Sequence, residues 1–206
     1  MQILKKHQTP LYIVNRIRQI FFQHQNPEAP WLTRQSIALL DQLIMKTDNG
    51  LEFGSGRSTK WLAARCHHLT SVEHDEKWYS LVNKMLIERT NVKYLLRSLN
   101  KDNPVLSEYL NPFNDLEDQS IDFVLVDGRI REFVAHLAIQ KLKSGGLLII
   151  DNAEYFFPNN YNLSSSIGIK IESIPKEWKE FYNSTIDWRR IWTSDGISAT
   201  LIFFKV

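Results

Sequence analysis

The sequence predicts an α/β fold in which a mostly parallel sheet is covered by helices on both faces. Short apolar runs alternate with stretches of helical spacing between residues 50 and 150. The runs at 121–126 and 146–150 are almost continuously apolar, which is typical of strands buried on both faces. Near the end of the chain, Asp195-Gly196 separates two further apolar segments and predicts an antiparallel hairpin.

The elements follow from local patterns. Apolar residues recur at helical spacing over 11–22 and 32–44, so we expect an N-terminal helical extension of residues 1–47 before a core of residues 48–206. The hydroxyl of Ser58 or Thr59 is the expected N-cap of the first core helix. Strands are expected at 50–53, 69–73, 92–96, 121–126, 146–150, 188–193 and 197–206, and helices at 58–65, 76–89, 104–110 and 130–142.

Length and charge limit the classes of protein to consider. The chain has 206 residues, which fits a single domain with a substantial core. Its formal net charge of +2 is too small to indicate nucleic acid as a partner. No apolar run approaches the ~20 residues that cross a bilayer, and the single cysteine, Cys66, fits a reducing compartment. We therefore expect a cytoplasmic protein with neither a membrane nor a nucleic-acid partner.

The most informative segment is the glycine turn Glu52-Phe53-Gly54-Ser55-Gly56. It follows an expected strand and precedes an expected helix, and the acidic Glu73 ends the next strand about 20 residues later. In α/β folds this arrangement holds the ribose of a nucleoside. A dinucleotide fingerprint requires a glycine where Thr59 stands, and the carboxylate of Glu52 favours a cationic ligand over a pyrophosphate.

These residues resemble the first motif of the class I S-adenosylmethionine-dependent methyltransferases, E/D-x-G-x-G-x-G, with Ser58 at the third glycine. The resemblance implies a Rossmann-like, seven-stranded sheet of order 3-2-1-4-5-7-6 with a C-terminal antiparallel hairpin. It implies that the glycine turn approaches the methionine moiety and that Glu73 holds the ribose hydroxyls. The cofactor contacts that it implies are Glu52, Gly54, Ser55, Gly56, Glu73, His74, Arg97, Ser98 and Asp127.

A second set of polar residues ends the fourth and fifth expected strands. Asp127, Asp151 and Asn152 resemble the Mg²⁺ ligands of the catechol-type O-methyltransferases, and Mg²⁺ prefers oxygen ligands. The alternative interpretation is that these side chains cap the turns that follow the strands. Ile130 stands where that family has a lysine base, so a lysine-based mechanism is not expected.

The expected function is transfer of a methyl group to a small-molecule acceptor, most simply to an oxygen atom, with Asp127 or His74 taking the acceptor proton. Aromatic residues late in the chain either border the acceptor site or pack the hairpin: Trp178, Tyr182, Trp188 and Trp192. A non-catalytic S-adenosylmethionine-binding protein, a nicotinamide-dependent oxidoreductase and an aminopropyltransferase are the alternatives. The sequence leaves a homodimer open.

Overall fold

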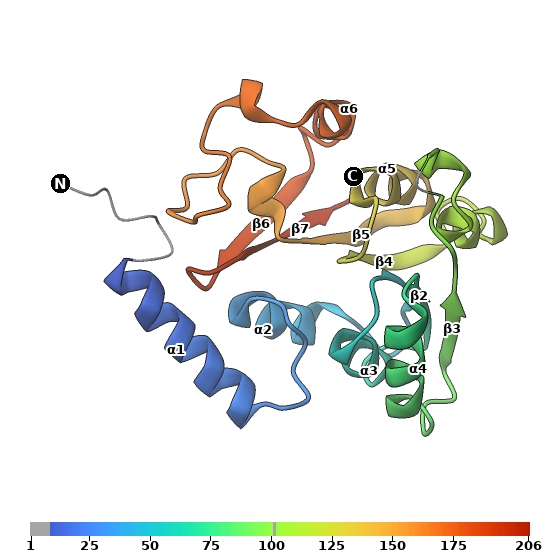
Figure 1. Ribbon diagram of the computed structural model, residues 1–206. Coiled ribbons are helices and arrows are strands. Elements are labelled where there is room, and N and C mark those ends of the chain that lie inside the picture. Colours follow the sequence, from blue (N-terminus) through green and yellow to red (C-terminus); the bar gives the residue numbers. More distant parts are fainter. Residues whose placement is uncertain (1–8, 101) are drawn as a thin grey trace.

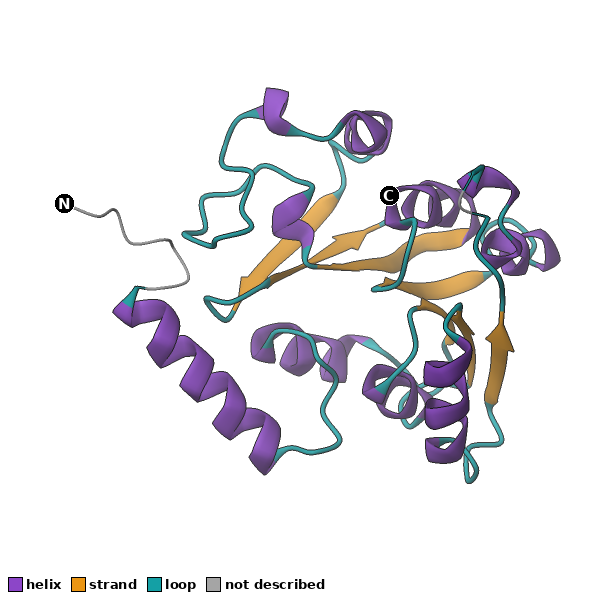
Figure 2. Ribbon diagram, in the orientation of Figure 1, coloured by secondary structure: helices purple, strands orange, loops and turns teal. Residues whose placement is uncertain are grey.

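The computed structural model describes residues 9–100 and 102–206, which form a seven-stranded sheet covered by helices (Figures 1 and 2). The strand order is β3-β2-β1-β4-β5-β7-β6; the first five strands are parallel, and β7 is antiparallel to both β5 and β6. This confirms the predicted fold class. The strands are β1 (Asn49–Phe53), β2 (His68–Glu73), β3 (Val92–Leu96), β4 (Ile121–Val126), β5 (Leu142–Asp151), β6 (Arg189–Ser194) and β7 (Ala199–Phe204).

The helices lie between the strands, as alternation predicts. The α-helices are α1 (Pro10–Gln25), α2 (Arg34–Leu43), α3 (Arg57–Ala63), α4 (Glu76–Met85), α5 (Arg131–Lys141) and α6 (Lys176–Ser184). Short 3-10 segments are η2 (Pro104–Leu106), η3 (Glu108–Asp115), η4 (Ala153–Tyr155) and η5 (Ile171–Ser173). Residues 1–8 of the predicted N-terminal extension lie outside the described residues.

Two predicted details of the helices and strands were wrong. The first core helix is capped at Gly56, so Ser58 and Thr59 lie inside α3 instead of at its N-cap. The strand expected at 146–150 is longer, because β5 begins at Leu142. Gly145 has a φ of +79°, and the pairing of β4 with β5 shifts register between Ile121 and Phe123, so the strand accommodates the glycines as an irregularity.

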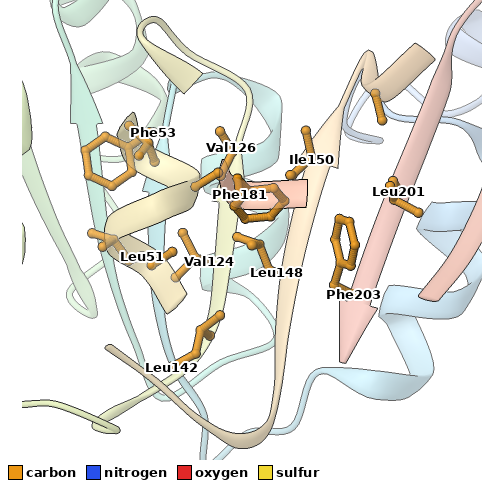
Figure 3. Packing of buried hydrophobic residues seen from close by; sticks show 14 of the residues in the cluster. Leu51, Phe53, Val124, Val126, Leu142, Leu148, Ile150, Phe181, Leu201 and Phe203 are labelled. Atoms are coloured by element: carbon orange, nitrogen blue, oxygen red, sulfur yellow. The ribbon is translucent and has the colours of Figure 1, made fainter. Parts of the chain in front are cut away.

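Alternating residues of the central strands pack into cores on opposite faces of the sheet. Val124 and Val126 of β4 face α5 and α6, and Figure 3 shows this cluster with Ile150 and Phe203. The neighbouring residues of β4, such as Phe123, face α2 and α3. Burial on both faces explains why the predicted central strands are apolar almost without interruption.

Buried hydroxyl groups connect the start of α2 to the C-terminal hairpin. The hydroxyl groups of Thr33 and Thr193 are 2.6 Å apart, and the Thr33 N–H donates to the Thr200 hydroxyl at 3.4 Å. The Thr200 hydroxyl donates to the Asp151 carboxylate at 2.8 Å. Segments distant in sequence therefore meet at the end of β5, next to the site described below.

Among the described residues, none of the helices has the length and apolar character to traverse a bilayer.

Candidate functional site

A cavity of about 450 Å³ opens at the carboxyl ends of β1, β2 and β4. Loops after parallel strands meet at this edge, which is where open α/β sheets bind ligands. Three segments contribute most of the lining, and single residues from α4, α5 and the α1–α2 connection complete it. The lining residues are Trp31, Gly54, Ser55, Gly56, Arg57, Ser58, Glu73, His74, Asp75, Trp78, Asp127, Gly128, Arg129 and Arg131.

The glycine turn forms the floor of this cavity. Gly54 has a φ of +94°, and a Cβ there would lie 2.6 Å from the backbone nitrogen of Gly128. A Cβ on Gly128 would lie 2.9 Å from the backbone nitrogen of Gly54, so the two glycines pack back to back. Gly56 differs, because a Cβ there would meet only a ring carbon of Trp78, at 3.8 Å. The missing side chain of Gly56 therefore leaves room in the cavity for a close approach by a ligand.

Glu73, the predicted ribose acid, lies at the end of β2 with its carboxylate held in a fixed orientation. One oxygen atom, Oε1, accepts hydrogen bonds from the N–H groups of His74 and Asp75 at 2.7 and 2.9 Å, and it lies 2.9 Å from Nδ1 of His74. The other, Oε2, accepts from the Ser55 N–H and hydroxyl at 3.3 and 3.0 Å. Ser55 also contacts the Tyr94 hydroxyl at 2.6 Å. The structure thus brings Ser55, Glu73 and His74 together.

Glu52 is fully buried beneath the turn and is not among the residues that line the cavity. Its Oε2 accepts hydrogen bonds from the hydroxyl groups of Thr59 and Ser71, both at 2.6 Å. Its Oε1 has no hydrogen-bond partner among the described residues. Burial raises the pKa of Glu52 to about 7, against the opposing effect of the hydroxyl groups around it.

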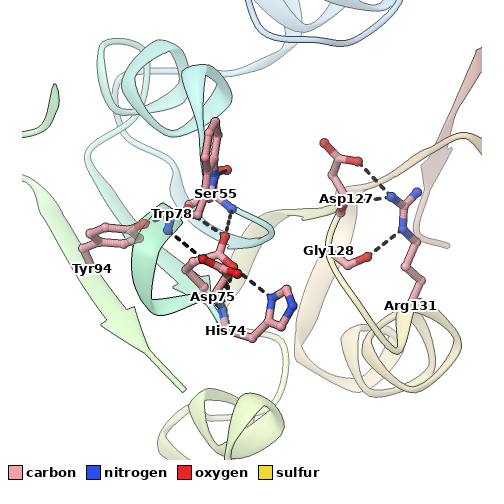
Figure 4. Close-up of polar contacts among 9 residues, drawn as sticks. Ser55, His74, Asp75, Trp78, Tyr94, Asp127, Gly128 and Arg131 are labelled. Atoms are coloured by element: carbon pink, nitrogen blue, oxygen red, sulfur yellow. Dashed lines mark hydrogen bonds and ion pairs between the residues drawn. The ribbon is translucent and has the colours of Figure 1, made fainter. Parts of the chain in front are cut away.

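Arg131, at the start of α5, connects the ends of β4 and β5, and Figure 4 shows its contacts with Asp127 and Gly128. Its Nε donates to the Gly128 carbonyl at 3.0 Å, and Nη2 donates to the Asp127 carbonyl and carboxylate at 2.9 and 3.0 Å. Nη1 donates to the Asp151 carbonyl at 2.5 Å and to the Asn152 side-chain oxygen at 3.4 Å. These five contacts match the five N–H donors of a guanidinium group.

The guanidinium group of Arg131 lies where the predicted Mg²⁺ ion would bind. It occupies the space between Asp127 and Asn152, two of the three predicted Mg²⁺ ligands, and uses an oxygen atom of each. An Oδ atom of the third, Asp151, accepts from Thr200 instead. No group of three or more His, Cys, Asp or Glu side chains suited to a metal ion occurs among residues 9–100 and 102–206. The structure does not support the predicted Mg²⁺ site, because a fixed cation already fills it.

The carboxyl groups at this end of the sheet have perturbed acidities. Burial raises the pKa of Asp127 to about 6, although the adjacent Arg131 opposes the rise. Burial also raises the pKa of Asp151, and the charge of Asp127 adds to this effect. The candidate residues from the sequence include the acidic Glu52, Glu73, Asp127 and Asp151. In the structure Glu73, Asp75 and Asp127 share the cavity lining with three arginines, so the charges balance.

Some predicted residues lie elsewhere, and some lining residues were missed. Arg97 and Ser98 are not part of the cavity lining; Ser98 donates to Glu108 at 2.8 Å. Trp178 packs in the core, where its ring stacks on Phe156 at 4.6 Å. Trp31 was missed because its position between two helices carries no signal in the sequence, whereas Arg57 follows Gly56 directly and could have been found.

Aromatic rings and an arginine form part of the cavity wall near its opening. The rings of Trp31 and Trp78 stack with centroids 6.4 Å apart, and the guanidinium carbon of Arg57 lies 5.5 Å from the Trp31 ring centroid. The Trp78 indole N–H donates to the Ser55 carbonyl at 2.8 Å, which fixes this ring against the glycine turn. The site therefore offers an acidic side at Glu73, a basic side at the arginines, and an aromatic edge.

Comparison with known proteins gives the fold. No protein-family model matches the sequence, and no curated protein is significantly similar to it. A candidate caffeoyl-CoA O-methyltransferase from Staphylococcus aureus is 18% identical with a TM-score of 0.59, over 97% of this chain and 95% of that one. A candidate methyltransferase from Streptococcus mutans, solved with S-adenosylhomocysteine, is 12% identical with a TM-score of 0.54, over 84% and 96%.

A third structure shows how widely the acceptors of this fold vary. An rRNA methylase from Streptococcus thermophilus is 12% identical with a TM-score of 0.52, over 83% of this chain and 93% of that one. The structural similarity shows a shared architecture, and sequence identities this low leave the methyl acceptor of this chain open. Strand order, the antiparallel β7 and these structural neighbours together show that the chain has the fold of the class I methyltransferases.

Proposed function

We propose that the protein is an S-adenosylmethionine-dependent methyltransferase that acts on a small-molecule acceptor. The observation that carries this proposal is the placement of Gly56 and the Glu73 carboxylate in the lining of one cavity. The volume of that cavity, about 450 Å³, is within the range of small-molecule sites. Structural neighbours include methyltransferases, one of them with S-adenosylhomocysteine bound.

The residues present suit this cofactor. Gly56 leaves the backbone open to close approach, and the Glu73 carboxylate would accept hydrogen bonds from the ribose hydroxyls. The side chains of Arg57 and Arg129 have no hydrogen-bond acceptor among the described residues, so either could pair with a carboxylate of the cofactor or of the acceptor. When bound, S-adenosylmethionine would supply a methyl group activated by its positively charged sulfur.

The protein would contribute orientation, exclusion of water and a proton acceptor. Trp31 and Trp78 would shield the reacting groups from solvent. The cavity would hold the cofactor and the acceptor close together in a fixed orientation. Asp127 would take the proton that the acceptor loses, because its pKa of about 6 leaves it largely ionised at pH 7. Arg131 would hold that carboxylate in place. His74, whose Nδ1 faces Glu73, is the alternative base through its Nε2.

Thermal denaturation with S-adenosylhomocysteine tests the proposal. At about 100 times its Kd, the ligand should raise the free energy of unfolding by about 2.7 kcal/mol. For a chain of this size that corresponds to an increase in Tm of about 5–10 °C. Glu73→Ala should abolish the increase, and Glu88→Ala, at an exposed position outside the lining, should retain it.

A second variant protects the test against a folding defect, because Glu73 also accepts two backbone N–H groups. The methyl group of Gly56→Ala would make only an ordinary van der Waals contact, 3.8 Å from a ring carbon of Trp78, so the variant should melt like the wild type and lose the ligand-induced increase. A wild-type protein stabilised by NAD and not by S-adenosylhomocysteine would contradict the proposal. Binding without methyl transfer to any acceptor would indicate the non-catalytic alternative.

A further inference from the structure

Helix α1 stands apart from the rest of the molecule and contains no buried residue (Figure 1). Its half-buried side chains are Tyr12, Asn15, Gln19, Phe22 and Gln23, which recur at intervals of three and four residues and therefore share one side of the helix. This mostly polar side faces the β6–β7 hairpin. Gln19 donates to Asp195 at 3.4 Å, and Asn15 packs against Gly196.

The apolar side of α1 faces away from the domain. Six large apolar side chains of the helix are between 43% and 63% exposed: Leu11, Ile13, Val14, Ile17, Ile20 and Phe21. A helix that packs on its own domain normally buries its apolar face and exposes its polar face. Here the orientation is reversed, so the apolar face is available to a partner outside this chain.

Charge indicates which partner. The first 27 residues of the sequence contain four lysines and arginines and no aspartate or glutamate, whereas the rest of the chain has more acidic than basic residues. Arg16 and Arg18 lie within α1 beside the apolar residues, and both are exposed. Exposed apolar residues flanked by basic groups are typical of helices that lie in the surface of a bilayer containing anionic lipids.

The same charges disfavour a second copy of the chain on this face. Two α1 helices packed through their apolar residues would bring their arginines together, and neither helix has an acidic residue to pair with them. A lipid surface supplies the missing anions and accepts the apolar side chains. A helix that lies on the surface of a membrane can be shorter than one that crosses the bilayer.

We infer that α1 binds the protein peripherally to membranes rich in anionic phospholipid, with its apolar face in the lipid and Arg16 and Arg18 at the headgroups. This inference does not depend on the proposed methyltransferase activity. It also modifies the expectation from the sequence that the protein has no membrane partner, because that expectation considered only segments that cross the bilayer.

Vesicle co-sedimentation of the full chain tests the inference. With vesicles of phosphatidylcholine and about 30% phosphatidylserine, the wild type should sediment, and it should stay in solution with phosphatidylcholine alone. Replacing both arginines with glutamate should lower the partition coefficient by about tenfold or more. Raising the salt concentration should weaken binding, since screening acts on exposed charges. Lys84→Glu/Lys179→Glu changes net charge equally at exposed sites outside α1 and should bind like the wild type.

Ile17→Gln/Phe21→Gln tests the apolar contribution. Both side chains are exposed, so the variant should keep the wild-type Tm while it loses vesicle binding. A wild type that stays in solution with the anionic vesicles, or a Gln variant that sediments with them as the wild type does, would overturn the inference. A wild type that is dimeric by light scattering and becomes monomeric in the Gln variant would overturn it too, since a second copy would then cover this face.

Discussion

At the scale of single residues, the acidic side chains near the glycine turn differ in what surrounds them. Glu73 has donors on both carboxylate oxygens, whereas Oε1 of the buried Glu52 has none among the described residues. The sequence predicted both positions from one motif and could not distinguish them, because burial depends on the loops that meet above β1. Because burial raises the pKa of Glu52, its protonation and the folding of the chain are linked.

The stability of the protein should depend on pH through Glu52. Its pKa is about 7 when folded, above the ordinary value of 4.5 for a glutamate, so the folded state binds the proton more strongly than the unfolded state. The contribution of Glu52 is then most favourable below about pH 4.5 and falls as pH rises to about 7. The rise in pKa corresponds to about 3 kcal/mol.

Urea denaturation of the wild type and of Glu52→Gln at pH 5 and pH 8 checks this. Glutamine does not ionise, so the variant should gain about 2.5 kcal/mol relative to the wild type between these two pH values, the rest of the effect lying below pH 5. A constant difference between the two proteins would mean that Glu52 does not titrate in this range.

At the scale of elements, Arg131 connects the ends of β4 and β5 by contacts to three carbonyl and two side-chain oxygen atoms. The sequence placed Asp127, Asp151 and Asn152 correctly at the ends of these strands. It could not show that an arginine of the next helix folds back between them, since that depends on how α5 leaves the loop. Ile130, which precedes it, has a φ of +43° and redirects the chain at this point.

Arg131→Met should lower the free energy of unfolding by about 2–4 kcal/mol, because it removes the donors of a partly buried carboxylate and two carbonyl groups at strand ends. Arg129→Met, two residues earlier and exposed, should change the free energy of unfolding little.

Calorimetry of the wild type with Mg²⁺ should show no saturable binding. Saturable binding that Asp127→Asn removes would contradict our assignment of the cation in this site.

The contact between the loops after β1 and β4 leads to a second prediction, on the stability of glycine variants. Gly54→Ala would put a side chain at a φ of +94° and its Cβ 2.6 Å from the backbone nitrogen of Gly128. The variant should therefore lower the free energy of unfolding by about 2–4 kcal/mol. Gly168→Ala isolates the effect of φ, which is +82° there with no atom within 4 Å, and should cost about 1 kcal/mol. Thermal and urea denaturation of the pair checks this, and equal losses would mean that the contact with Gly128 is unimportant.

At the scale of the whole molecule, the sequence predicted the alternation of strands and helices, while the strand order came from resemblance to a known motif. The parallel core was predictable because its strands are apolar on both faces. Helix α6 was missed because Trp178 and Phe181 stand in a short segment surrounded by polar residues. The orientation of α1 could not be predicted either, since the periodicity of an amphipathic helix does not say which side the domain contacts.

The back-to-back contact of Gly54 and Gly128 limits how this fold can diversify. A methyl group on either glycine meets the backbone of the other loop, so neither position tolerates a larger residue without displacing its neighbour. During evolution the floor of the pocket would therefore remain nearly invariant in shape. New substrate preferences would have to arise from its perimeter, where Trp31 and Arg129 are free to change without such a collision.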